Sequence, residues 1–410
     1  MGCGFGAPSR LFPGHRGGLT GVAFHPDGSE LATVSGDRAT GLWDVATSRR
    51  RAFLRGQRIG ITGIAFSPDG SALAAGCDDR TVTLWDTVSG HRRLSLQGHR
   101  SGVNGVAFSP DGSLLASGSE DGTAGLWDLA SGQNLGLLRG HLGAVRCVAF
   151  RPVGGLLATG SDDRTAALWE IGTGQRRATL QGHQGRVNAV AFSADGTLLA
   201  SCGRDGAAML WEVTTGQRRT IIQGHQLPIT GLAFSPDGTV FATGSDDRTA
   251  TLWDIASGRS RTSLHGHLAG ITGVAFSPDG NLIATASRDR TARLWDGGFG
   301  RHLATFQGHQ DSVTSVTFSP DGAILATGSA DNTGRLWHVW TGKCLAILAN
   351  TPEGWAAFTP DGRYRFGGII KGNFWFAINL CRFEPAELDR HLPAPLILAD
   401  DAPILPSAPA

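Results

Sequence analysis

The sequence predicts an all-β protein in which eight copies of one four-stranded antiparallel unit are arranged in a closed ring. Three observations support this fold. Tryptophan recurs every 42 residues from Trp43 to Trp337, most copies carry Gly-His at a fixed distance before it, and most contain a Pro-Asp-Gly turn between two short apolar stretches. Repetition at a fixed period of this length is typical of proteins built from tandem structural units.

Each copy is predicted to contain four strands in a fixed order. An alternating apolar stretch such as 187–192 follows Gly-His, and a Ser-Pro-Asp-Gly turn separates it from a second apolar run. Proline fixes φ and glycine accepts positive φ, so this turn is tight. A Ser-Asp-Asp-Arg-Thr stretch leads to a third strand ending in Leu-Trp-Asp, and a segment of the Gln-Arg-Arg-Ala-Thr-Leu type supplies the fourth strand.

These marks resemble the WD-repeat β-propeller family of the bacterial type, in which Gly-His and Trp-Asp recur at 40 to 45 residues. The resemblance covers residues 14–348 and implies a closed eight-bladed β-propeller of four-stranded antiparallel blades. The sheet of each blade has two faces to cover, and packing against both neighbours around the ring covers them.

The sequence outside the repeats divides into three segments. Residues 1–13 include 9–12, which are in register for an outer strand that completes the last blade, although 343–348 fit the same slot. Residues 349–392 predict a partial repeat or a cap over the ring: 355–362 match the first strand and turn of a repeat, and 374–383 predict one more buried strand. A nine-bladed ring is therefore the alternative architecture. Residues 393–410 have the Pro/Ala-rich composition of a loose tail.

Composition argues against several classes of protein. With 40% apolar residues and a net charge of +1, the chain resembles neither a disordered protein nor one that mainly coats nucleic acid. No apolar run reaches the roughly 18 residues that span a bilayer, and the first ten residues lack the apolar core of a signal peptide. Six widely spaced cysteines without a Cys-x-x-Cys pair indicate a reducing compartment. We therefore expect a cytoplasmic monomer without a membrane partner.

The resemblance implies a buried chain of hydrogen bonds, a tetrad, that links aspartate, histidine, serine and tryptophan in each blade, so that every polar group has a partner. Blade 2 lacks two members, with Gln57 for histidine and Cys77 for serine, and blade 5 has Gly203 for serine. The six complete sets are His15, Ser35, Asp37, Trp43; His99, Ser119, Asp121, Trp127; His141, Ser161, Asp163, Trp169; His225, Ser245, Asp247, Trp253; His267, Ser287, Asp289, Trp295; and His309, Ser329, Asp331, Trp337.

Aspartate, histidine and serine also form the triad of nucleophilic hydrolases. Six sets at a fixed interval, each with a tryptophan on the hydroxyl, favour a structural role instead, so we predict no catalytic residues. Neighbouring aspartates such as Asp162 and Asp163 lack the spacing of a calcium loop, and no metal or cofactor is predicted.

The resemblance implies a non-enzymatic scaffold that binds other proteins on its upper face. Three positions per repeat point to that face: three and five residues after the histidine, and the residue before the tetrad aspartate. No aromatic residue occurs at these positions, so arginine is the remaining hot-spot type. The predicted partner-binding residues, for an acidic segment or a carboxylate-bearing loop, are Arg146, Arg186, Arg204, Asn104, Asn188, Glu120 and Asp162. The competing interpretation is a surface ion pair between Arg204 and Asp162.

A second candidate function is polyanion or nucleic-acid binding through paired arginines on the outer strands. Near-zero net charge and the lack of interleaved aromatic residues argue against it, and charged outer strands also prevent edge-to-edge aggregation. The arginines are Arg50, Arg51, Arg92, Arg93, Arg176, Arg177, Arg218 and Arg219.

Overall fold

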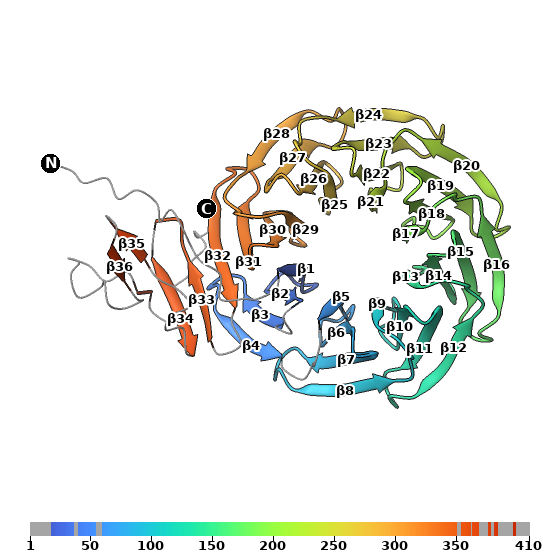
Figure 1. Ribbon diagram of the computed structural model, residues 1–410, viewed down its shortest axis with the longest axis horizontal. Coiled ribbons are helices and arrows are strands. Elements are labelled where there is room, and N and C mark those ends of the chain that lie inside the picture. Colours follow the sequence, from blue (N-terminus) through green and yellow to red (C-terminus); the bar gives the residue numbers. More distant parts are fainter. Residues whose placement is uncertain are drawn as a thin grey trace.

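A computed structural model describes residues 18–36, 40–54, 60–350, 354–361, 363–368, 376–378, 381–383 and 397–398. Eight antiparallel sheets surround a central channel, and each contributes four strands that run in chain order from the channel to the rim (Figure 1). We number these blades 1 to 8 along the chain. The prediction of an eight-bladed propeller is confirmed, and the nine-bladed alternative is wrong.

The strands at each radial position have nearly equal lengths. The innermost are β1 (Leu19–Phe24), β5 (Ile61–Phe66), β9 (Val103–Phe108), β13 (Val145–Phe150), β17 (Val187–Phe192), β21 (Ile229–Phe234), β25 (Ile271–Phe276) and β29 (Val313–Phe318). The second are β2 (Glu30–Ser35), β6 (Ala72–Cys77), β10 (Leu114–Ser119), β14 (Leu156–Ser161), β18 (Leu198–Gly203), β22 (Val240–Ser245), β26 (Leu282–Ser287) and β30 (Ile324–Ser329).

The outer half of each blade is built in the same way. The third strands are β3 (Thr40–Asp44), β7 (Thr81–Asp86), β11 (Thr123–Asp128), β15 (Thr165–Glu170), β19 (Ala207–Glu212), β23 (Ala250–Asp254), β27 (Ala292–Asp296) and β31 (Thr333–His338). The outermost are β4 (Arg50–Leu54), β8 (Arg92–Gln97), β12 (Asn134–Arg139), β16 (Arg176–Gln181), β20 (Arg218–Gln223), β24 (Ser260–Leu264), β28 (His302–Phe306) and β32 (Cys344–Asn350).

The Ser-Pro-Asp-Gly turns join the first two strands of a blade at the lower face. In blade 2, the Ser67 hydroxyl donates to Asp69 Oδ1 at 2.6 Å, and the same oxygen accepts from the Ser71 amide. Gly70 has φ of 74°, a conformation that glycine adopts without steric cost. Because each strand reverses direction, the opposite, upper face carries the Gly-His loops and the loops between second and third strands.

The hydrophobic core lies between neighbouring blades. The repeat tryptophan of each blade is buried against the blade before it: Trp85, for example, packs with Leu42 and Leu54 of blade 1, and Trp169 with Leu126 and Leu138 of blade 3. Both faces of every sheet are covered in this way, so the ring has to be closed for the last face to be buried.

In the part of the chain that the structure describes, blade 8 meets blade 1 without an exchanged strand. The outermost position of blade 8 is filled by β32, and residues 9–12, which the sequence offered for that slot, lie outside the described residues. The Thr314 hydroxyl on β29 donates to the Leu19 carbonyl on β1 at 2.8 Å, which joins the ends of the ring.

Two further strands extend the sheet of blade 8 outward, beyond the ring (Figure 1). These are β33 (Gly354–Phe358), which pairs with β32, and β34 (Tyr364–Gly368), which pairs with β33. A separate hairpin follows, formed by β35 (Phe376–Ile378) and β36 (Cys381–Phe383), so the prediction of one strand over 374–383 is wrong. These pieces add neither a ninth blade nor, in the case of β33 and β34, a cap over the channel.

The added strands also bind the first blade. Trp355 on β33 lies edge-on to Trp43 of blade 1, with ring centroids 5.9 Å apart. Arg50 of blade 1 donates to the Gly354 carbonyl at 3.0 Å, and the buried Arg365 donates to the Thr47 carbonyl at 2.7 Å. The extension therefore holds the seam between blades 8 and 1 from outside.

Candidate protein-binding face

The upper face is hollowed where the chain enters the innermost strands of blades 1 to 5. The cavity has a volume of about 480 Å³ and opens to solvent. Its lining includes Asp78 on one side and Arg146, Arg186, Asn104 and Asn188 from blades 3 to 5 on the other. Four of the seven predicted partner-binding residues thus lie around one depression.

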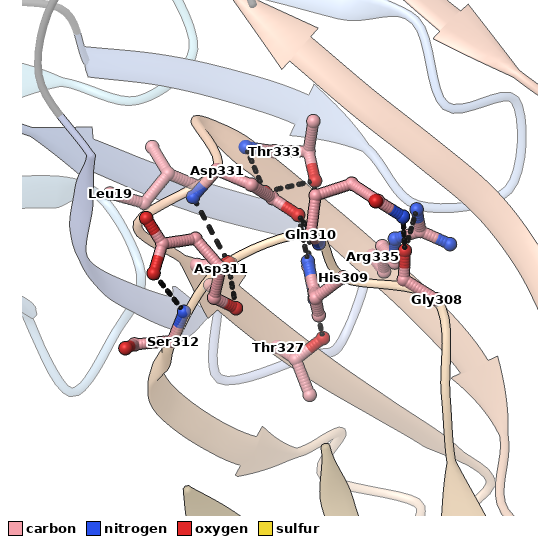
Figure 2. A network of polar contacts seen from close by, with 12 residues as sticks. Leu19, Gly308, His309, Gln310, Asp311, Ser312, Thr327, Asp331, Thr333 and Arg335 are labelled. Atoms are coloured by element: carbon pink, nitrogen blue, oxygen red, sulfur yellow. Dashed lines mark hydrogen bonds and ion pairs between the residues drawn. The ribbon is translucent and has the colours of Figure 1, made fainter. Parts of the chain in front are cut away.

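The loops of the upper face are held in place by the histidine networks. In blade 8, the Trp337 indole donates to the Thr327 hydroxyl at 2.9 Å. Thr327 Oγ1 lies 2.8 Å from His309 Nε2, and His309 Nδ1 lies 2.9 Å from Asp331 (Figure 2). Asp331 also accepts from the Gln310 amide and the Thr333 hydroxyl. The same chain occurs in blades 3 to 8, with histidines His99, His141, His183, His225, His267 and His309.

The hydroxyl in this chain is not the predicted serine. It belongs to the residue two positions earlier, and the members are Ser117, Thr159, Ser201, Thr243, Thr285 and Thr327, with Thr33 accepting from Trp43 in blade 1. The predicted serines donate instead to loop carbonyls of the same blade: Ser35, Ser119, Ser161, Ser245, Ser287 and Ser329. His15 and Asp37 lie outside the described residues.

Burial and hydrogen bonding shift the pKa values of several network members. Burial lowers the pKa of His99 and His309, which favours neutral imidazoles that donate from Nδ1 and accept at Nε2. Burial alone would raise the pKa of Asp247, but hydrogen bonds from Thr249 and His225 outweigh it and leave this pKa below its ordinary value. The polar groups of each network hydrogen-bond to one another, as expected for a structural element rather than a catalytic one.

Blade 5 is complete, contrary to the interpretation of Gly203 as a defect, because Ser201 supplies the hydroxyl to His183 and Trp211. Blade 2 lacks it. Ala75 stands at the hydroxyl position, Cys77 donates to the Ala75 carbonyl, and the buried Trp85 Nε1 has no hydrogen-bond partner among the described residues.

We expect Ala75→Ser to stabilise the protein by about 1 kcal/mol, because the new hydroxyl gives the Trp85 indole an acceptor. The matched control is Ala74→Ser, which adds a hydroxyl at a buried position that is alanine in all eight blades. Urea denaturation should show a higher midpoint for Ala75→Ser and a lower one for Ala74→Ser. A loss of stability in both variants would contradict the assignment.

A belt of side-chain hydrogen bonds joins the blades around the channel. The residue five positions after each histidine lies at a β-bulge in the innermost strand, which turns its side chain toward the next blade. Asn104 donates to the Val145 carbonyl at 2.9 Å and Asn188 to the Ile229 carbonyl at 2.7 Å. Threonines do the same at five other boundaries, and these are Thr20, Thr62, Thr230, Thr272 and Thr314. The two asparagines predicted to bind a partner are therefore already engaged.

The belt is interrupted between blades 4 and 5, where the bulge residue is Arg146. Its guanidinium turns to Asp162 of its own blade, with Nε to Oδ1 at 2.9 Å and Nη2 to Oδ2 at 2.5 Å, and lies 4.0 Å from Glu120. The hydrogen bonds from Arg146, with the charges of Arg146 and Arg186, hold the pKa of Asp162 below its ordinary value. In blade 4, the side chain at this position therefore makes no hydrogen bond to the described residues of the next blade and instead places a charged group at the cavity.

Arg186 and Arg204 of blade 5 are exposed, and neither forms an ion pair within the described residues. Arg186 Nε donates to Asn188 at 3.1 Å. The proposed pairing of Arg204 with Asp162 is wrong, because Asp162 is occupied by Arg146. An ion pair in that register does occur between blades 6 and 7, where Arg288 lies 2.7 Å from Asp246. The carboxylates on both sides of blade 5 are therefore already paired.

Most outer-strand arginines are held within the protein. Five of the eight pair with Glu30 or Asp86 or donate to backbone carbonyls, and these are Arg50, Arg51, Arg93, Arg176 and Arg177. This use favours a structural role over polyanion binding. Within the described part of the chain, no group of histidine, cysteine, aspartate and glutamate side chains is arranged to hold a metal ion. That part also contains no helix long and apolar enough to cross a bilayer.

Comparison with known proteins shows the same repeat. Eight segments match the family model described as "WD domain, G-beta repeat", namely residues 6–44, 48–86, 90–128, 132–170, 174–212, 216–254, 258–296 and 300–338. Among solved structures, the crystal structure of the computationally designed Ika8 protein is similar, with a TM-score of 0.72 and 31% identity over 82% of this chain and 100% of that chain. A search of curated proteins gave no match.

Proposed function

The chain belongs to the WD40 repeat family, and from this premise we propose that it is a non-enzymatic scaffold that holds a partner protein on its upper face at blades 4 and 5. Members of this family are commonly protein-interaction scaffolds and are mostly not enzymes. The partner would be a protein or peptide with an acidic segment.

One observation carries the proposal. Arg186 and Arg204 on blade 5 are exposed and form no ion pair with any described residue, while Asp162 and Asp246 of the flanking blades are paired with Arg146 and Arg288. An unpaired guanidinium offers several donors in a planar fork that matches a carboxylate. Asp162 and Asp246 do not pair with these two arginines, so an incoming carboxylate can bind their donors.

The interruption of the belt supports the same location. Asparagine or threonine at position 146 would match the other boundaries, and arginine there forgoes a contact to the next blade. Departures from a local structural rule concentrate at functional sites. Arg146 also lines the cavity beside Arg186, so the departure and the unpaired charge lie together.

We further propose a reducing compartment such as the bacterial cytoplasm. Within the described part of the chain, Cys77, Cys147, Cys202 and Cys344 form no disulfide bond, and burial raises the pKa of Cys147 to about 12, which keeps that thiol protonated and unreactive. The strong preference for arginine over lysine, with Lys343 and Lys371 as the two lysines, is typical of GC-rich coding.

The double variant Arg186→Glu/Arg204→Glu is expected to bind its partner protein more weakly than wild type does. Two repulsive charges replace two attractive ones on the proposed surface, while neither side chain supports the fold. The full chain, immobilised and incubated with a lysate of its source cells, should retain fewer partner proteins as the double variant than as wild type, with equal melting temperatures. Arg146 is left unchanged, because a glutamate there would face Asp162 and Glu120.

The matched control is Arg92→Glu/Arg219→Glu, which makes the same charge change on exposed outer-strand positions. It should capture partners as wild type does. Equal capture by wild type and the blade 5 variant would contradict the proposed face, and a loss confined to the outer-strand variant would favour polyanion binding.

A further inference from the structure

We propose that the segment recognised on this face is an acidic sequence flanked by apolar side chains, with its carboxylates on Arg186 and Arg204 and its apolar residues on Leu142 and Leu227. The inference rests on the proposed function and specifies its partner. It follows from a second feature of the same surface, the exposed leucines of the Gly-His loops.

Three large apolar side chains of the upper face lie in solvent within four adjacent blades. Leu142 of blade 4 is 96% exposed, Leu227 of blade 6 is 49% exposed and Leu268 of blade 7 is 79% exposed. Each follows a tetrad histidine by one or two residues, in a loop whose backbone is fixed by the network; the Leu142 amide, for example, donates to Asp163 at 2.9 Å. These leucines are therefore held outward by rigid loops.

The loops of two of these leucines adjoin residues next to the unpaired arginines. Gly206, two residues after Arg204, lies so close to blade 6 that a Cβ there would be 3.2 Å from the Leu227 carbonyl oxygen. On the other side, a Cβ on Gly143, next to Leu142, would be 3.1 Å from Asp162 Cβ, and Asp162 lies in the field of Arg186. In blade order, the loop of Leu142 therefore comes before the two arginines of blade 5, and the loop of Leu227 comes after them.

The other repeats show that leucine is not required by the fold. At the position of Leu142 the other described blades carry polar residues except for Leu268, and these are Arg100, Gln184, Gln226 and Gln310. At the position of Leu227, blade 3 has Ser101 and blade 5 has Gly185. The same loops fold with polar side chains, so the exposed leucines add nothing that the loop needs.

The two features complement each other energetically. An ion pair on an exposed surface gains little, because water competes for both charges. Apolar contacts on either side exclude that water and contribute area of their own, so an acidic segment with apolar flanks binds better than one without them. The arginines therefore favour acidic residues in the middle of the bound peptide, and the leucines favour apolar residues on either side of them.

The test is selection from a displayed library of short random peptides on the full-length protein, with counter-selection on Arg186→Glu/Arg204→Glu. The enriched peptides are expected to contain Asp or Glu between Leu, Ile, Phe or Met. Synthetic copies of these peptides should then bind Leu142→Gln/Leu227→Ser with a dissociation constant at least about tenfold higher than for wild type, measured by fluorescence anisotropy. This variant uses residues that other blades carry at these positions, so its fold should be intact.

The matched control is Leu135→Gln/Val88→Ser, which removes exposed apolar side chains away from the upper face and should leave affinity unchanged. Acidic peptides that lack apolar flanks, or that bind the leucine variant as tightly as wild type, would overturn this inference and leave the arginine site in place. Peptides that bind the arginine variant equally well would overturn the proposed face itself. No enrichment over the counter-selection would also contradict the inference.

Discussion

Replacing Trp355 with alanine is expected to lower the free energy of unfolding by roughly 3–5 kcal/mol, the usual cost of emptying a buried tryptophan site. Trp355 is buried in a cluster that combines blade 8, blade 1 and the added strand β33, and it contacts Trp43 edge-on. The substitution removes packing from the one boundary where the two ends of the ring meet. Urea denaturation gives the change in free energy.

The matched control for this variant is Trp340→Ala, because Trp340 is 70% exposed and its loss should change stability by about 0.5 kcal/mol or less. Hydrogen exchange should locate the damage, with faster exchange in β1, β29 and β33 and little change in blade 5. Equal stability losses in both variants, or faster exchange spread evenly over the ring, would show that the extension does not hold the seam.

Replacing His225 with alanine is expected to cost roughly 2–5 kcal/mol, because it leaves buried hydrogen-bonding groups without a partner. Thr243 loses its acceptor, Asp247 loses the imidazole donor, and an apolar void opens beside Trp253. Gln57→Ala should cost less, since blade 2 already lacks the hydroxyl at Ala75. Equal losses of melting temperature in the two variants would contradict the structural role of the network.

Two further variants identify the hydroxyl in that network. Thr243→Ala removes the acceptor of the Trp253 indole and should destabilise more than Ser245→Ala, which removes a hydrogen bond to the Leu227 carbonyl. Thr243→Ser should recover most of the loss, as serine occupies this position in blades 3 and 5. A larger effect at Ser245 would restore the original assignment.

The repeat made most of the ring predictable from sequence. A fixed tryptophan interval, turns at Pro-Asp-Gly and alternating apolar residues define the four strands of each blade, and the inter-blade packing follows from the need to cover two faces per sheet. Those signals are local, and eight copies repeat them. Blade 5 shows that the rule is robust, because its strands form despite several departures from the common pattern.

The hydroxyl was misassigned because alternate residues of a strand share one face. Thr243 and Ser245 both point to the same side of β22, and the sequence does not say which one the indole reaches. Register decides it: Trp253 pairs with Phe241, so Thr243 is its diagonal neighbour and Ser245 lies too far along the strand. Counting back from the tryptophan across the hairpin would have identified Thr243.

The extension and the exception at Arg146 depend on tertiary context. Strand β33 resembles the first strand of a repeat, yet it adds to the edge of β32, because blade 8 already has four strands and its outer edge is free to pair. The position of Arg146 signals an upper-face side chain, but its commitment to Asp162 rather than to a partner depends on side-chain geometry. The same geometry leaves Arg186 and Arg204 as the available pair.

The most direct test of the proposed binding face is a hydrogen-exchange footprint of the full chain with and without a partner protein that it has captured. We expect slower amide exchange on binding in 183–188 and 203–207, the segments that carry Arg186 and Arg204, and in the neighbouring Gly-His loops at Leu142 and Leu227. Slower exchange confined to the Pro-Asp-Gly turns or the outermost strands, with these loops unchanged, would contradict it.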